Sequence, residues 1–134
     1  NDSCATAEPV TAIPFTGSGD TTNAVDDYAT ADGDCAGTWQ DQGTGAGDVA
    51  FVFTPAASQT YTITVTPDAN YDVAFYVVTN CADIGSSCVY QVDQGQPGVV
   101  ETGQVALTAG TSYWIVIDGW GTSGSEGSFT IDIQ

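Results

Sequence analysis

The chain has 134 residues, which is the length of a single domain spanning 1–134, and 42% of them are hydrophobic. This apolar content, with three Trp, six Tyr and five Phe, excludes a disordered acidic tail and predicts a folded core. The formal net charge is −17 because the sequence contains no Lys, Arg or His, so we expect neither nucleic acid nor an anionic membrane surface as a partner.

The missing cations also bear on folding. The acidic side chains have no cationic side chain to pair with, so their repulsion must be relieved by solvent, salt or bound metal. One interpretation is an acidic surface that serves solubility or high salt. The interpretation we favour is that divalent cations are structural parts of the protein.

Several features predict a secreted protein. The sequence has no Met, so we expect that Asn1 follows a removed segment, a secretory signal peptide. Four Cys in a chain rich in Thr, Gly and Ser are typical of disulfides formed in an oxidising compartment. No apolar run approaches the ~20 residues of a membrane span, so we expect no membrane insertion. The predicted location is extracellular or at the cell surface.

The first strand is expected at 10–15, and the longest stretch without a strand pattern follows it, at 17–47. A loop of this length in a compact domain is usually functional or tied down. Its aspartates are dense, and a glycine between two of them allows a sharp turn: Asp26-Asp27 and Asp32-Gly33-Asp34. Calcium prefers several hard oxygen ligands of this kind, although the spacing is not that of an EF-hand. The loop is therefore either a calcium site, which we favour, or a solvated acidic loop.

The remaining strands are predicted from alternation of apolar and polar residues. In "TYTITVT" the residues Tyr61, Ile63 and Val65 alternate with threonines, and "SYWIVID" and "SFTIDIQ" repeat the pattern. Strands are expected at 48–54, 60–66, 72–78, 89–93, 99–107, 112–118 and 128–134. About eight short strands with one buried face predict an all-β fold, an antiparallel β-sandwich of jelly-roll type.

The four cysteines allow three pairings. Cys81 and Cys88 flank the short segment "ADIGSS", so we predict that they bond to each other and leave Cys4 with Cys35. Zinc is a poor alternative because histidine is absent and the C-x6-C spacing is not that of a zinc knuckle.

Three residues near strand ends have two interpretations each. Asp72 and Asp118 are expected to cap backbone amides in turns rather than to form a binding site. Trp120 lies in a Gly- and Ser-rich loop, where it either stacks on a sugar or a neighbouring protein at an interface, or anchors the loop.

Catalysis is not expected. A serine triad or a cysteine–histidine pair needs a base of a type that the chain lacks, and phosphoryl transfer needs cationic groups. A carboxylate pair for glycoside hydrolysis remains formally available, but 17 acidic residues will form such pairs by chance.

An ordered series of segments carries a resemblance that covers nearly the whole chain: "NDSCATAEPV", "FTGSG", "GDVAFVFTPAASQTYTITV", "YDVAFYVVTNC" and "VALTAGTSYWIVIDGWG…GSFTIDI". Together they resemble the bacterial pre-peptidase C-terminal domain family, which is similar in fold to the collagen-binding domains of clostridial collagenases. The resemblance implies a non-catalytic extracellular β-sandwich that binds calcium near its N-terminus. The matching acidic positions are Asp2, Asp26, Asp27 and Asp48. Two residues after the last of these the family commonly has an aromatic residue, whereas this chain has Ala50.

Two functions follow as hypotheses. The first is a structural subunit that self-associates into an extracellular filament, tube or matrix, with Ca²⁺ bridging its acidic faces and exposed strand edges available for pairing. The second is an accessory module of a larger secreted hydrolase that binds a polysaccharide or a protein. We favour the first.

Overall fold

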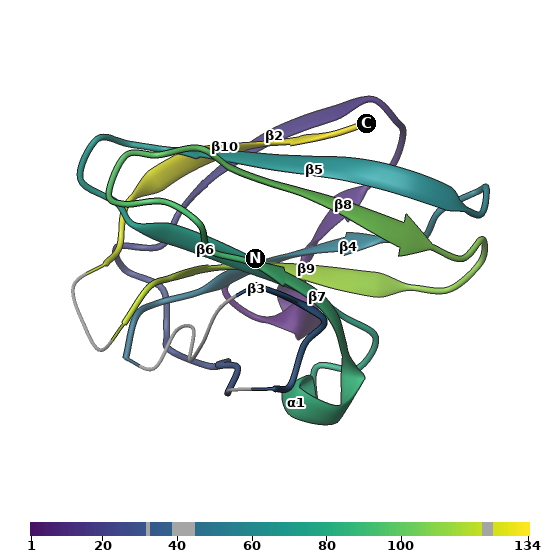
Figure 1. Cartoon of the computed structure of the whole chain (residues 1–134), viewed down its shortest axis with the longest axis horizontal. Helices are drawn as coiled ribbons and strands as arrows, with labels where there is room; N and C mark the ends of the chain where they lie inside the picture. The colour runs from purple at the N-terminus through teal and green to yellow at the C-terminus, as the bar shows by residue number, and fades with distance from the viewer. Residues whose placement is uncertain (32, 39–44, 122–124) are drawn as a thin grey trace.

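The structure is a computed structural model that describes residues 1–31, 33–38, 45–121 and 125–134; the predicted ligand Asp32 lies outside this part of the chain. In the described residues, ten strands form two sheets that face each other (Figure 1). The six-stranded sheet has the order β1-β4-β9-β6-β7-β3, and the four-stranded sheet has the order β2-β10-β5-β8. The elements are η1 (Cys4–Thr6), β1 (Glu8–Val10), β2 (Phe15–Asp20), β3 (Gly37–Thr38), β4 (Val49–Phe53), β5 (Gln59–Pro67), β6 (Val73–Val78), α1 (Ile84–Ser87), β7 (Cys88–Val92), β8 (Glu101–Leu107), β9 (Tyr113–Gly119) and β10 (Ser128–Ile133).

The sequence alternation is confirmed by burial. On β5, β9 and β10 the apolar residues of one face are all in the core between the sheets: Tyr61, Ile63, Val65, Tyr113, Ile115, Ile117, Phe129, Ile131 and Ile133. Burial of each large apolar side chain contributes about 1.5–3 kcal/mol, so this face holds the two sheets together. The predicted β-sandwich is confirmed.

The predicted strand at 10–15 is wrong in its bounds. β1 ends at Val10 and β2 begins at Phe15, with Pro14 just before it. Proline has no amide hydrogen for a strand ladder, and here the chain passes from the six-stranded to the four-stranded sheet. Two edge pairings, β1 with β4 and β3 with β7, are parallel, whereas the other strand pairings are antiparallel.

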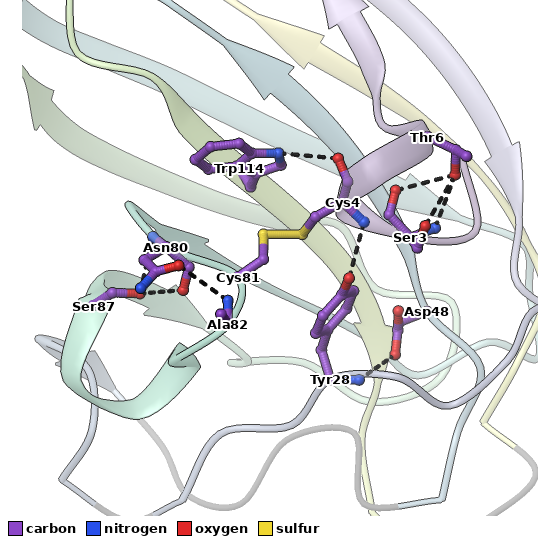
Figure 2. Close-up of a disulfide and its surroundings, with 10 residues drawn as sticks. All are labelled: Ser3, Cys4, Thr6, Tyr28, Asp48, Asn80, Cys81, Ala82, Ser87 and Trp114. Carbon is purple, nitrogen blue, oxygen red and sulfur yellow. Dashed lines mark hydrogen bonds between the residues drawn. A yellow bond between two sulfur atoms is a disulfide. The ribbon is translucent and has the colours of Figure 1, made fainter.

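The predicted disulfide pairing is also wrong. The bonds are Cys4–Cys81 and Cys35–Cys88, with sequence separations of 77 and 53 residues. The parallel register of β3 on β7 pairs Gly37 with Gln91, so Cys35, two residues before β3, lies beside the start of β7, where Cys88 is the first residue. Between Cys81 and Cys88 the chain forms α1, so these two cysteines do not bond to each other. Cys81 instead bonds to Cys4 of the N-terminal segment (Figure 2).

The outer face of the six-stranded sheet is covered as well. All six residues of β6 are buried, and Tyr76, Val78 and Val116 form a second apolar cluster on that face. Residues from 22–31, from 33–36 and from α1 pack on it, and Figure 1 shows these segments on the side away from the four-stranded sheet. We call residues 22–31 and 33–36 together with α1 the cover. The cover contains Asp26, Asp27 and Asp34 of the predicted acidic loop.

Among the described residues, no helix is both long enough and apolar enough to cross a membrane.

Candidate functional site

Asp48 is the centre of the candidate site. It immediately precedes β4, its side chain is fully buried, and its Oδ2 atom accepts hydrogen bonds from the backbone amides of Asp27 and Tyr28, both at 2.9 Å. The other carboxylate oxygen, Oδ1, is buried and has no hydrogen-bond partner within the described residues. A buried oxygen of a carboxylate without a partner carries a desolvation cost, so it is the natural place for a ligand.

The N-terminal segment lies against the same place. The Asp2 Oδ1 atom accepts a hydrogen bond from the amide of Val25 at 2.7 Å, and the Asn1 carbonyl accepts one from the amide of Ala50 at 2.8 Å. Tyr28 completes the link, since its hydroxyl accepts a hydrogen bond from the amide of Cys4 at 2.9 Å (Figure 2). Asp2, Asp27 and Asp48 are therefore brought into one region by backbone contacts of the cover.

The electrostatics of Asp48 are unfavourable to its charge. Burial raises the pKa of Asp48 to about 7, and the negative charges of Asp27 and Asp26 act in the same direction. The two amide hydrogen bonds lower this pKa but do not outweigh burial. A carboxylate in this position is poised either to hold a proton or to bind a cation.

Asp118 is a second buried carboxylate, and the sequence interpretation as a turn cap describes only part of its role. Its Oδ1 atom accepts from the amide of Gly119 at 2.7 Å, as a cap would, but its Oδ2 atom accepts from the Tyr76 hydroxyl at 3.0 Å beneath the cover. Burial raises the pKa of Asp118, and the charge of Asp48 raises it further, because β4 and β9 are adjacent. In "SYWIVID" the alternation puts Asp118 on the same face as Trp114 and Val116, and this was the signal available in the sequence for its position.

Asp34 does not join this group. Its carboxylate accepts a hydrogen bond from the amide of Ala31 at 2.8 Å and lies 2.9 Å from the point that a Cβ atom on Gly85 of α1 would occupy. Of the predicted ligands, the described structure gathers Asp2, Asp26, Asp27 and Asp48, and leaves Asp34 in a local turn.

The fit of this group to calcium rests on Asp48. Within the described residues, no three acidic or cysteine side chains are already arranged around a common point as metal ligands. However, the Oδ1 atom of Asp48 is an unpartnered carboxyl oxygen, and the exposed carboxylates of Asp26 and Asp27 are near enough for their charges to raise the pKa of Asp48. The donor chemistry is that of calcium, a hard cation that prefers oxygen.

Trp120, the predicted interface residue, has a side chain that is 54% exposed. Part of the indole is therefore available to a ligand, while the Trp120 amide donates a hydrogen bond to the Asp72 carbonyl at 2.9 Å.

These features define a disulfide-bonded β-sandwich in which an acidic cover lies on the outer face of the six-stranded sheet. The chain has the fold of the pre-peptidase C-terminal domain of collagenase from Bacillus anthracis, with a TM-score of 0.60 over 96% of this chain and 94% of that chain. The two sequences are 9% identical, so what they share is the fold, and the resemblance seen in the sequence is confirmed at that level.

Two further solved structures are more distant. The periplasmic inhibitor of g-type lysozyme from Aeromonas hydrophila is 14% identical with a TM-score of 0.45, over 96% of each chain. A family 35 carbohydrate-binding module from an environmental isolate is 16% identical with a TM-score of 0.47, over 69% of this chain and 68% of that chain. No family model and no curated protein matches the chain.

Proposed function

We propose that this chain is a non-catalytic, secreted, calcium-dependent binding domain. In this proposal Asp48, Asp26 and Asp27 hold Ca²⁺, and Asp2 brings the N-terminal segment to the site. The ion supplies positive charge that no side chain of this protein can supply.

The observation that carries the proposal is the unpartnered Oδ1 atom of Asp48. At an effective dielectric of ~20, two unit charges ~4 Å apart repel by about 4 kcal/mol, and a stability of only ~5–15 kcal/mol tolerates few such contacts. A bound dication turns these repulsions into attractions. Calcium would thereby fix the cover on the sheet.

Calorimetry of calcium binding tests this. We expect the chain to bind Ca²⁺, and Asp48→Asn to lower the affinity at least about tenfold, since a ligand charge worth about 1.4 kcal/mol or more is lost. The melting temperature should rise with free calcium, because an ion that binds only the folded state adds about 2.7 kcal/mol at a hundredfold excess over its dissociation constant.

Asp34→Asn is the matched control, because it removes one negative charge from the same loop at a residue held in a local turn. We expect it to leave the calcium affinity almost unchanged. Identical melting curves in calcium and in chelator would contradict the proposal and leave the acidic cover as a solvated surface.

Secretion and lack of catalysis are supported by different observations. The disulfide Cys35–Cys88 ties the cover to β7, and Cys4–Cys81 ties the N-terminal segment to the chain just before α1. Such bonds persist in oxidising compartments. The similar domain from Bacillus anthracis is described as the pre-peptidase C-terminal domain of a collagenase, so it is one domain of a hydrolase. An accessory module that binds a polysaccharide or a protein is consistent with both.

A structural subunit is the second candidate, and β8 favours it. This strand lies at the edge of the four-stranded sheet, and within the described residues it pairs only with β5. Its exposed residues alternate regularly with buried ones over seven positions, which suits pairing with a strand of another copy. Negative-stain microscopy of the chain with calcium and with chelator tests this assembly.

A further inference from the structure

A pocket of about 340 Å³ opens at one end of the six-stranded sheet, apart from the residues proposed to bind calcium. Its lining residues are Asp72, Asp93, Gln94, Gly95, Gln96 and Trp120. Asp72 precedes β6, whereas Asp93 and Trp120 follow β7 and β9, and these three strands are neighbours in the sheet. The volume is in the range of sites for small ligands or single side chains.

The backbone holds Asp72 and Trp120 together. The amide of Trp120 donates to the Asp72 carbonyl at 2.9 Å, and the Ser125 hydroxyl donates to the same carbonyl at 2.8 Å. Trp120 is 54% exposed, and it lines the same pocket as Asp72, so the backbone contacts keep an aromatic and an acidic residue together at this pocket.

Glu101 adds a buried acid next to the pocket wall. Its Oε1 atom accepts a hydrogen bond from the amide of Gln94 at 2.9 Å, whereas its Oε2 atom is buried and has no partner among the described residues. Burial raises the pKa of Glu101, and the charges of Asp93 and Asp72 raise it further. Burial also raises the pKa of Asp72. The pocket therefore concentrates negative charge that no cationic side chain of this protein offsets.

We propose that this pocket receives a lysine or arginine side chain of a partner protein. The ammonium or guanidinium group lies near Asp72 and Asp93, and the Trp120 face packs against it in a cation–π contact, for which Trp is the best aromatic residue. Its aliphatic stem covers apolar surface while the charged end reaches the carboxylates.

Two observations specify the kind of partner. Val99 and Val100 are 47% and 46% exposed, and the amide of Val99 donates to the carbonyl of Gln96 in the pocket wall. A polypeptide that carries the bound side chain can cover this apolar surface beside the pocket, whereas a free amine cannot. A second copy of this chain has no Lys or Arg to offer, so the partner is a different protein. The inference rests on the proposed role as a binding domain but not on calcium.

The test is an NMR titration of the ¹⁵N-labelled chain with Nα-acetyl-lysine amide in calcium-containing buffer. We expect shifts of the Trp120 indole and of the Gln94 and Gly95 amides, and an affinity that falls as sodium chloride is added. The matched neutral probe is Nα,Nε-diacetyl-lysine amide, which keeps the stem without the charge and should bind at least about tenfold more weakly. N-acetylglucosamine serves as the sugar probe and should give no shifts at these residues.

Two variants separate the pocket from general attraction to an acidic surface. Asp72→Asn and Trp120→Ala should each lower the affinity for the lysine probe severalfold. Asp132→Asn on β10, in the other sheet, is the control and should leave this affinity unchanged. Equal binding of the neutral probe or of the sugar, equal loss in Asp132→Asn, or no shift with the lysine probe would each overturn the proposal. If calorimetry instead finds no calcium binding while the lysine probe still binds, the calcium site fails and this pocket stands.

Discussion

At the scale of single residues, Asp48 makes the stability of the protein depend on pH. The folded state raises the pKa of Asp48 to about 7 from an ordinary value of 3.8, so between these values the folded chain binds a proton that the unfolded chain has released. By linkage, the contribution of Asp48 to the free energy of unfolding is fully present below pH about 4 and is lost as the pH rises towards about 7. The raised pKa values of Asp118 and Glu101 act in the same direction.

We therefore expect the melting temperature in chelator to fall as the pH is raised through this window. Asp48→Asn, which resembles the protonated acid, should remove about 2–4 kcal/mol of this dependence, because each pKa unit corresponds to about 1.4 kcal/mol. Thermal melts of both chains across the pH range measure it. A profile that is equally steep in the variant would contradict the assignment to Asp48.

At the scale of elements, Gly103 sets how closely β8 approaches β7 of the opposite sheet. A Cβ atom at this position would lie 2.5 Å from Cε1 of Tyr90 and 2.8 Å from Cγ2 of Val92, both of which are nearer than a real Cβ contact allows. Glycine at position 103 has no side chain, and this allows the two sheets to approach closely here.

Gly103→Ala should lower the free energy of unfolding by about 1–3 kcal/mol, as overpacking of a core does. Urea unfolding measures it as a lower midpoint with an unchanged slope. Gln104→Ala is the control, because the next residue along β8 is exposed, and we expect it to stay within about 0.5 kcal/mol of the parent. Equal midpoints for Gly103→Ala and the parent would contradict the close approach.

At the scale of the whole molecule, the net charge of −17 opposes any association of copies, while the β8 edge favours it. Sodium chloride weakens this repulsion by screening but has no directed ligands, whereas calcium can bridge carboxylates of two copies. Whether the chain assembles therefore depends on the balance between the repulsion of the negative charges and the strand pairing that the β8 edge offers.

If the chain is a structural subunit, we expect particles in calcium that dissolve in chelator and are restored only in part by sodium chloride of matched ionic strength. Static light scattering and negative-stain microscopy measure this. A single monomeric species under all three conditions would contradict the structural-subunit hypothesis and leave the accessory binding domain as the proposed function.

Much of the fold could be predicted from local pattern. Alternation placed Tyr61, Ile63 and Val65 in the core because a strand sends successive side chains to opposite faces, whatever the rest of the chain does. The same rule placed Asp118 on the outer face of β9. It could not predict that a further layer of the chain buries Asp118 on that face. The absence of cationic side chains, and with it the need for outside positive charge, is likewise a property of composition.

What only the tertiary structure decided depends on segments that are distant in sequence. Cys35 meets Cys88 because β3 pairs with β7, and a short loop between Cys81 and Cys88 carries no information about that pairing. Asp48 became a buried, half-partnered carboxylate because the cover folds over the start of β4, and Asp34, equally acidic in sequence, stayed in a turn. The pocket beside Trp120 likewise exists because the start of β6 lies beside the ends of β7 and β9. Composition and periodicity act within each strand, whereas burial of a charge is set by which distant segment comes to lie on it.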